Sequence, residues 1–105
     1  MIVTTWNNGS YNSSGSGYGV RISKLNRAEF FNESWDKVVI HIGEVENTVD
    51  IHINNTFWGK CPELRSIEIG KYLIKKGLNT WEKGNPHRVL LIHKHNNEFI
   101  LKVDN

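Results

Sequence analysis

Short segments in which apolar and polar residues alternate recur along this chain. Segments 38–42 and 49–53 alternate in this way and are separated by a predicted turn at 43–48. Segments 88–95 and 98–103 form a second pair, joined by an Asn-Asn turn. A period of two residues places every second side chain on one face of a strand, so the pattern predicts two β-hairpins, each with one buried face.

Other segments extend the number of expected strands. Residues 1–6 and 17–22 predict two further strands, and 56–58 is a candidate for a third. Together with the two hairpins, these segments give about seven short strands. Short strands leave many unpaired edges, and closing the sheet on itself is an economical way to protect them. We therefore expect a mainly β fold of mostly antiparallel strands, arranged as a closed or nearly closed barrel.

Two segments predict short helices. Ser23 is a favourable N-cap, and apolar residues follow it at helical spacing until the helix ends near Asn32. Pro62 occupies the favoured first position of a second helix, which we predict over residues 63–76. Gly70 inside this helix indicates a place where it packs closely against a sheet.

The chain has 105 residues, of which 38% are hydrophobic and 23% are charged, with a formal net charge of +2. This length supports a single domain over residues 1–105 with one modest core. No apolar run approaches the roughly 20 residues of a membrane helix, and the first residues lack the pattern of a secretory signal. Cys61 is the sole cysteine, which excludes an internal disulfide and is typical of a reducing compartment. We therefore expect a cytoplasmic protein without a membrane partner.

Residues 7–19 form a long run of Gly, Ser, Asn and Tyr between two predicted strands. Such a composition is typical of flexible linkers, whereas a long loop inside a domain often has a function. Its amide and hydroxyl groups offer hydrogen-bond donors and acceptors, and its glycines let a partner approach the backbone closely. A flexible surface loop and a binding arm both fit this segment.

Side chains that could support catalysis or bind metal are present, but they form no recognisable signature. His93 and His95 share one face of a predicted strand, while His41 and His52 lie at polar positions of the first hairpin. None of them stands in a tight zinc-ligand spacing, so ordinary surface histidines are the favoured interpretation. Cys61 is favoured as a partly buried apolar residue rather than a nucleophile. The sequence therefore predicts no enzyme activity, no metal site and no cofactor.

The segment SGSGYGVRISK at residues 14–24, which leads into a short predicted helix, resembles the start of the DNA-binding pseudobarrel. This fold is shared by the effector-binding domain of EcoRII-type restriction endonucleases, by related specificity domains of other restriction enzymes and by plant B-three transcription-factor domains. The order of the predicted elements is compatible with it. The resemblance implies a seven-stranded open pseudobarrel that grips double-stranded DNA in the major groove with two arms, one before the first helix and one near the middle of the chain.

Carried over by position, the resemblance places the first arm at residues 7–16 and the second at residues 54–65. Asparagine can hydrogen-bond adenine, arginine and lysine can hydrogen-bond guanine, and hydroxyl groups can hold phosphates. The first arm contains no Lys or Arg, so it either recognises bases with amides and hydroxyls or is not a DNA arm. Including basic residues in or beside other segments, the candidate DNA-binding residues are Asn7, Asn8, Tyr11, Asn12, Ser14, Arg21, Lys24, Asn55, Trp58, Lys60, Arg65, Lys83, His87 and Arg88.

The sequence leaves more than one functional class open. The leading hypothesis is a sequence-specific domain that binds double-stranded DNA and recognises targets in a restriction or defence system, with any nuclease on another domain or chain. The alternative is a protein-binding or small-ligand-binding module of a bacterial or phage defence system, with Tyr11, Trp58 and Trp81 as hydrophobic anchors. A small hydrolase would require histidines and Cys61 to converge in one pocket. We predict that Trp35 and Trp81 are structural.

Overall fold

The structure, a computed structural model, describes residues 1–43 and 47–103 of the chain. Within this part lie seven strands and three short helices. The predicted mainly β fold with about seven strands is therefore confirmed, and the predicted two helices are one too few. In chain order the elements are β1 (Ile2–Asn7), β2 (Tyr18–Arg21), α1 (Lys24–Phe30), β3 (Lys37–Ile42), β4 (Thr48–His52), α2 (Asn55–Trp58), β5 (Glu63–Arg65), α3 (Ile67–Lys75), β6 (Arg88–His95) and β7 (Glu98–Lys102).

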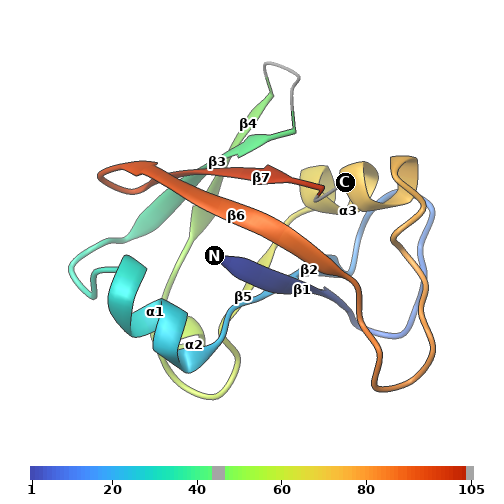
Figure 1. Cartoon of the computed structure of the whole chain (residues 1–105), viewed down its shortest axis with the longest axis horizontal. Coiled ribbons are helices and arrows are strands. Elements are labelled where there is room, and N and C mark those ends of the chain that lie inside the picture. Colours follow the sequence, from blue (N-terminus) through green and yellow to red (C-terminus); the bar gives the residue numbers. More distant parts are fainter. Residues whose placement is uncertain (44–46, 104–105) are drawn as a thin grey trace.

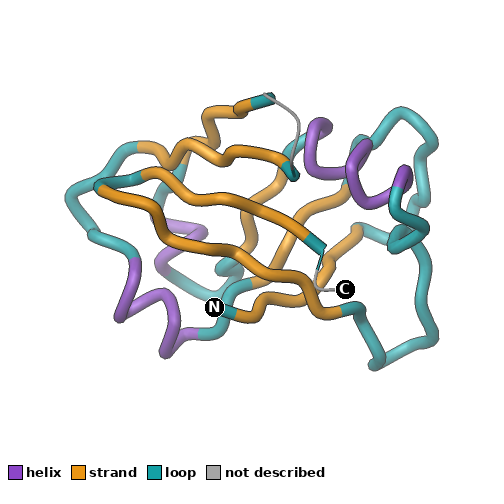
Figure 2. Tube along the Cα trace, turned by 45° about the horizontal axis from the view of Figure 1, so that its top comes forward, coloured by secondary structure: helices purple, strands orange, loops and turns teal. Residues whose placement is uncertain are grey.

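The seven strands form one mixed sheet that curls into a nearly closed barrel (Figure 1 and Figure 2). The strand order is β4-β3-β7-β6-β1-β2-β5, and every neighbouring pair is antiparallel except β3 and β7. The barrel has one seam, between the outermost strands β4 and β5, and the chain segment 53–62 connects these two strands. The prediction of an open barrel of mostly antiparallel strands is confirmed.

The core consists of inward-facing side chains from all seven strands, covered at one end of the barrel by α3 (Figure 1). Val38 and Ile40 of β3 are both 0% exposed, as their alternation with polar neighbours predicts. Burying one such side chain contributes about 1.5–3 kcal/mol. Ile69 and Leu73 of α3 are also 0% exposed and close the core on their side.

An aromatic cluster fills the core near α1 and α2. Phe31 stacks on Phe99 of β7 with ring centroids 4.7 Å apart, and Phe57 of α2 packs on Phe31 at 5.2 Å. Trp35 contacts both Phe31 and Phe99 edge to face. Offset and edge-to-face pairs of this kind stabilise a core beyond the area that they bury. Trp35 therefore has the structural role that was predicted for it.

The candidate strand at 56–58 is wrong, because these residues lie in the short helix α2. Asn54 caps this helix by accepting a hydrogen bond from Thr56 N at 3.0 Å. The single helical turn places Phe57 in the aromatic cluster, where it is 3% exposed. The cap and the burial of Phe57 therefore outweigh the β propensity of these residues.

The helix predicted over residues 63–76 begins later in the structure than predicted. Glu63–Arg65 form the strand β5, which pairs with β2, and α3 begins only at Ile67. Ser66 caps α3 by accepting a hydrogen bond from Glu68 N at 3.1 Å. Pairing with β2 covers the free edge of that strand and buries Leu64 completely, which outweighs a local preference for helix.

The remaining predicted elements agree with the structure. The first helix is capped by Ser23, which accepts a hydrogen bond from Asn26 N at 3.1 Å. Strands β3 and β4 form the first predicted hairpin, and β6 and β7 form the second. The predicted turn at 43–48 includes residues 44–46, which lie outside the described residues. Over the described ranges, every helix is too short or too polar to cross a membrane.

Candidate nucleic-acid interface

Strands β5, β2, β1 and β6 bring a row of polar side chains together on the outside of the barrel. The strand register aligns Glu63 with Arg21, Arg21 with Thr4, and Thr4 with Arg88. Opposed residues of antiparallel neighbours share one face of a sheet, and the residues that follow or precede them in each strand point into the core. The row therefore places two exposed arginines from distant parts of the chain on one surface.

A buried carboxylate binds two arginines of this surface. Glu63 Oε2 lies 3.1 Å from Arg21 Nε, and Glu63 Oε1 lies 2.7 Å from Arg65 Nη2. The Glu63 side chain is 1% exposed, whereas the side chains of Arg21 and Arg65 are 54% and 51% exposed. One buried anion beside two half-exposed cations leaves a positive surface, and each guanidinium retains further N–H donors for a ligand.

A second row lies two residues away from the first on β5, β2 and β1 and contains Arg65, Gly19 and Trp6. Because Gly19 has no side chain, Arg65 and Trp6 meet across it, with Arg65 Cζ 4.3 Å from the centroid of the Trp6 ring. A guanidinium over an indole is worth about 0.5–1 kcal/mol at an exposed site. We call the surface formed by the two rows the arginine face; its residues are Thr4, Trp6, Gly19, Arg21, Glu63, Arg65 and Arg88.

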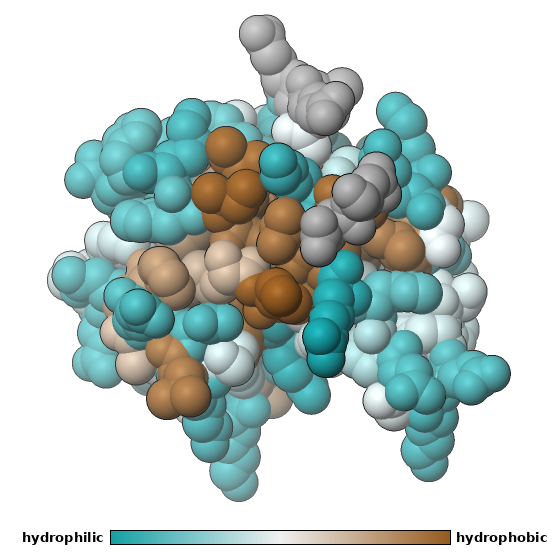
Figure 3. All heavy atoms as spheres, in the orientation of Figure 1, coloured by the Kyte–Doolittle hydropathy of each residue, from teal (hydrophilic) through white to brown (hydrophobic). Residues whose placement is uncertain are grey.

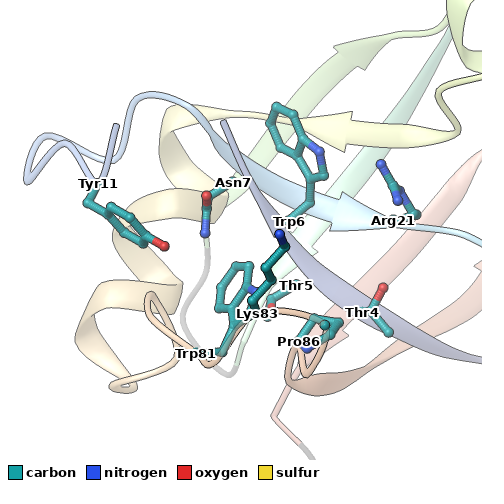
Figure 4. A pocket seen from close by; sticks show the side chains of 10 residues that line it. Thr4, Thr5, Trp6, Asn7, Tyr11, Arg21, Trp81, Lys83 and Pro86 are labelled. Atoms are coloured by element: carbon teal, nitrogen blue, oxygen red, sulfur yellow. The ribbon is translucent and has the colours of Figure 1, made fainter. Parts of the chain in front are cut away.

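A pocket of about 350 Å³ opens beside Trp6 (Figure 4). Trp6 and Trp81 lie on two sides of it, Lys83 lies between them in this view, and Tyr11 lies on a third side. Aromatic rings and cationic groups therefore share one cavity. The lining residues are Thr4, Thr5, Trp6, Asn7, Tyr11, Arg21, Trp81, Lys83, Gly84 and Pro86.

Hydrogen bonds hold the loop 78–87, which forms one wall of the pocket, against β1. His87 N donates to Thr5 Oγ1 at 3.0 Å, and Thr5 N donates to His87 O at 2.9 Å. His87 Nε2 lies 2.8 Å from Thr80 O. Trp81 packs edge to face on the His87 ring, with ring centroids 5.9 Å apart. The His87 ring is thus engaged within the loop, and Trp81 is positioned by it.

The first predicted arm is a folded loop with fixed ends. Asn8 N donates to Gly17 O at 2.9 Å, and a Cβ atom on Gly70 would lie only 2.0 Å from Gly15 O. The close contact predicted for Gly70 is therefore with this loop instead of the sheet. Between these ends, Tyr11 has a φ of 50°, which is rare for a residue other than glycine. This strained residue directs its ring toward the pocket (Figure 4).

Asparagines shape this first arm. The Oδ1 atoms of Asn7, Asn8 and Asn12 each accept a hydrogen bond from the backbone N–H two residues further along, at 2.8, 3.0 and 2.9 Å. Ser14 Oγ accepts one from the N–H of Ser16 at 3.3 Å. Turns of this type use the side-chain oxygen and leave the amide N–H groups as donors. The arm can therefore offer donors to phosphate oxygens or to base acceptors.

The second predicted arm, residues 54–65, comprises α2, the loop after it and the strand β5. Its α2 end lies at the other end of β2 from the first arm (Figure 1). Arg27 of α1 holds it by donating to two backbone oxygens near the end of α2, at 2.7 and 3.1 Å. The same guanidinium lies 5.4 Å from the centroid of the Trp58 ring, so Trp58 is partly covered. Asn55 and Lys60 are exposed, and Arg65, the last residue of the predicted arm, lies in β5.

The structure therefore divides the predicted DNA-binding residues into separate groups. The pocket and the arginine face contain Asn7, Tyr11, Arg21, Arg65, Lys83 and Arg88. Asn8, Asn12 and Ser14 lie on the first arm outside the pocket lining, His87 lies in the loop 78–87, and Lys24, Asn55, Trp58 and Lys60 lie on α1, α2 and the following loop. The first arm and the α2 end of the second arm are not brought together; the arginine face lies between them.

Trp6 and Glu63 belong to the site although sequence reasoning did not select them, and Trp81 was selected only as a hydrophobic anchor of the alternative binding module. A tryptophan near a strand end or in a loop is typical of a structural residue, and Trp81 lines the pocket as well as packing on His87. Glu63 falls inside the predicted helix, where its pairing with arginines of two strands is not visible. Recognising 63–65 as a strand would have placed Glu63 and Arg65 on the same face.

No protein-family model, curated protein or solved structure matches the chain. Among residues 1–43 and 47–103, no three His, Cys, Asp or Glu side chains are arranged to hold a metal ion. The groups that do converge are guanidinium and ammonium cations with aromatic rings, which are the groups that bind phosphates and bases in nucleic acids.

Proposed function

We propose that this domain binds double-stranded DNA across the arginine face. The observation that carries the proposal is the convergence of Arg21, Arg65 and Arg88 from three strands on one surface. Contacts with phosphates dominate the affinity of proteins for duplex DNA. A guanidinium suits them because its planar set of N–H donors matches the phosphate oxygens. The arginine face is therefore the surface expected to lie against the DNA backbone.

Loops at both ends of the arginine face extend the proposed contact. Lys60 and Asn55 lie at one end, and the first arm and Lys83 lie at the other. In the space-filling view, two groups of hydrophilic side chains project from the lower side of the molecule with a gap between them (Figure 3). A duplex lying across the arginine face would contact the loops at both of its ends, which fits the two arms that the resemblance to the DNA-binding pseudobarrel implies.

The proposal also accounts for a first arm without Lys or Arg. Lys83 lines the same pocket as Asn7 and Tyr11, so a neighbouring loop supplies positive charge beside the arm. The arm itself contributes amides and hydroxyls, which can hydrogen-bond base edges in the major groove. Charge and sequence recognition therefore come from different segments of the chain in this arrangement.

The resemblance extends the proposal to a biological role. Specificity domains of restriction enzymes recognise a target sequence while cleavage is performed elsewhere. We accordingly propose that this domain recognises its target in a restriction or other defence system in the cytoplasm, with a nuclease on another domain or chain as its partner.

A salt titration with a pool of randomised DNA duplexes tests the proposal. We expect the domain to retain a subset of duplexes that share a sequence motif, with an affinity that falls steeply as the salt concentration rises. Retention without an enriched motif would support duplex binding but remove sequence specificity. Absence of retention at low salt would overturn the proposed function and would favour a protein or small-ligand partner.

A further inference from the structure

On the basis of the proposed function, we propose that the pocket beside Trp6 receives one unpaired nucleobase of the bound DNA. The pocket adjoins the arginine face and shares Thr4, Trp6 and Arg21 with it. DNA held by the arginine face therefore passes the mouth of the pocket. A base that leaves the duplex at this point can enter the pocket while its strand stays bound.

The lining of the pocket suits a planar ring. Trp6, Trp81 and Tyr11 come from β1, the loop 78–87 and the first arm, and they lie on different sides of the cavity (Figure 4). Proteins hold a base outside a duplex by stacking it on aromatic side chains and by hydrogen-bonding its edge. Asn7 and Thr4 supply amide and hydroxyl groups in the same lining.

The size of the pocket favours a single nucleotide unit. Its volume of about 350 Å³ lies near the lower end of the roughly 300–1,000 Å³ that is typical of small-molecule sites. Such a cavity accommodates a base and part of its sugar, and it is too small for a segment of duplex. The pocket therefore complements the arginine face and does not replace it.

The walls of the pocket are held in place before a ligand binds. Arg65 covers the Trp6 ring at 4.3 Å, and Trp81 packs on His87, which is hydrogen-bonded to β1. Tyr11 is held at a φ of 50°, and strained backbone of this kind tends to occur at functional sites. Walls that are already ordered reduce the entropic cost of binding a ligand.

The charges around the pocket match a nucleotide. Arg21 and Lys83 are exposed cations of the lining, and no acidic residue occurs among the described lining residues. A phosphate next to an unpaired base would therefore meet Lys83 and the exposed part of Arg21, whose Nε is already bound by the buried carboxylate of Glu63. A neutral aromatic ligand would contact the rings but would not use these cations. The cations therefore favour a nucleotide, which carries a phosphate, as the ligand.

Three DNA duplexes of one sequence test the inference. The first is fully paired, the second contains one extra unpaired nucleotide, and the third has an abasic residue in place of that nucleotide. We expect the domain to bind the duplex with the unpaired base about tenfold more tightly than the abasic duplex, because stacking on aromatic rings is available only to the base. Fluorescence of 2-aminopurine at the unpaired position reports whether the base changes its environment on binding.

Variants of the pocket separate its contribution from that of the arginine face. Trp81→Ala should reduce the affinity ratio of the base-containing to the abasic duplex to near one, and Trp81→Phe should preserve most of it. Since Trp81 packs on His87, the exposed residue Lys83 provides a second variant, Lys83→Ala, which leaves the packing of the loop intact and should also lower this ratio. Lys75→Ala on α3 removes an exposed charge outside the pocket lining and should keep the wild-type ratio.

The outcomes distinguish this inference from the proposed function. Equal affinity for the base-containing and abasic duplexes would overturn the pocket assignment while duplex binding remained. Failure to bind all three duplexes would overturn the proposed function as well. Saturable binding of free AMP that Trp81→Ala abolishes, without a preference for the unpaired base in DNA, would identify a free nucleotide as the ligand and would also overturn the inference.

Discussion

The guanidinium of Arg65 lies over the indole ring of Trp6, with Arg65 Cζ 4.3 Å from the ring centroid. The same guanidinium donates to the buried carboxylate of Glu63 at 2.7 Å. One side chain therefore links the buried acid of β5 to an aromatic wall of the pocket on β1. The contact depends on Gly19, which lies between them and has no side chain to separate them. The arginine face is thus ordered by contacts within the sheet, and few side chains need to be ordered when a ligand binds.

Replacing Glu63 with Gln tests the link between the buried acid and the two arginines. The substitution keeps the shape of the side chain but leaves Arg21 and Arg65 without their counter-charge. Because both arginines are half exposed, the loss is smaller than for a fully buried ion pair. We expect the free energy of unfolding to fall by about 1–3 kcal/mol. Urea denaturation measures this change, with Glu82→Gln in the exposed loop 78–87 as the control. Equal unfolding midpoints for the two variants would contradict the link.

Two glycines of the first arm form a matched pair that tests its packing on α3. Gly9 and Gly15 have φ values of +89° and +93°, so alanine is strained at both positions. A Cβ on Gly15 would lie 2.6 Å from Ile67 O, whereas a Cβ on Gly9 would meet nothing within 4 Å. Gly15→Ala should therefore lower the free energy of unfolding by about 1–3 kcal/mol more than Gly9→Ala. Similar values from thermal unfolding would show that the arm does not pack on α3.

Ser66→Ala tests where α3 begins. If Ser66 is the N-cap, its replacement removes the acceptor for Glu68 N and should destabilise the domain by about 0.5–2 kcal/mol. If the helix began at Glu63, Ser66 would lie inside it and alanine would raise the stability slightly, because alanine has the highest helix propensity. The sign of the change in chemical denaturation therefore decides between the two helix boundaries.

Glu98 makes the stability of the barrel sensitive to acid. Its carboxylate lies 2.8 Å from His41 Nε2 on β3 and 3.0 Å from His95 Nε2 on β6. The hydrogen bond with His41 and the nearby positive charges lower the pKa of Glu98 below its usual value of 4.5. A carboxylate with a lowered pKa in the folded state stabilises the fold above its unfolded pKa, and this stabilisation is lost as the pH falls through the folded pKa.

We therefore expect the thermal unfolding midpoint of the wild type to decrease as the pH is lowered below about 4.5. The midpoint of Glu98→Gln should decrease less over the same range. The variant should also be less stable than the wild type near neutral pH, where the carboxylate is ionised. Differential scanning calorimetry across this range provides the measurement, with Glu82→Gln again as the control. Parallel pH profiles for Glu98→Gln and the wild type would refute this role of Glu98.

Local patterns were sufficient to predict the hairpins and the overall class of the fold. The β3–β4 and β6–β7 pairs join segments that are close in sequence, and alternation defines which of their side chains are buried. The strand β5 could not be predicted in this way, because three residues carry little signal and Pro62 favours a helix. Its strand conformation depends on pairing with β2, which lies more than 40 residues earlier.

The same limit explains what sequence reasoning missed at the site. Arg21 and Arg65 could be selected as exposed cations, but their common partner Glu63 and their approach to Trp6 depend on the order of strands in the sheet. The pocket likewise requires the first arm and the loop 78–87 to lie side by side. Composition indicated that the first arm could bind a partner, whereas only the structure places it beside Trp81 and Lys83.

The proposed interface with duplex DNA comprises the arginine face and its flanking loops. The most direct test measures the affinity for one duplex against salt concentration for the wild type and for the double variant Lys60→Ala/Arg88→Ala, which removes exposed charges from the second arm and from β6. Lys75→Ala/Lys94→Ala is the control, because it removes the same net charge from exposed positions outside the arginine face. We predict that the first variant binds more weakly and that its slope of log affinity against log salt is reduced by about 2, while the control keeps the wild-type slope. Equal slopes for both double variants would contradict DNA binding by the arginine face and its flanking loops.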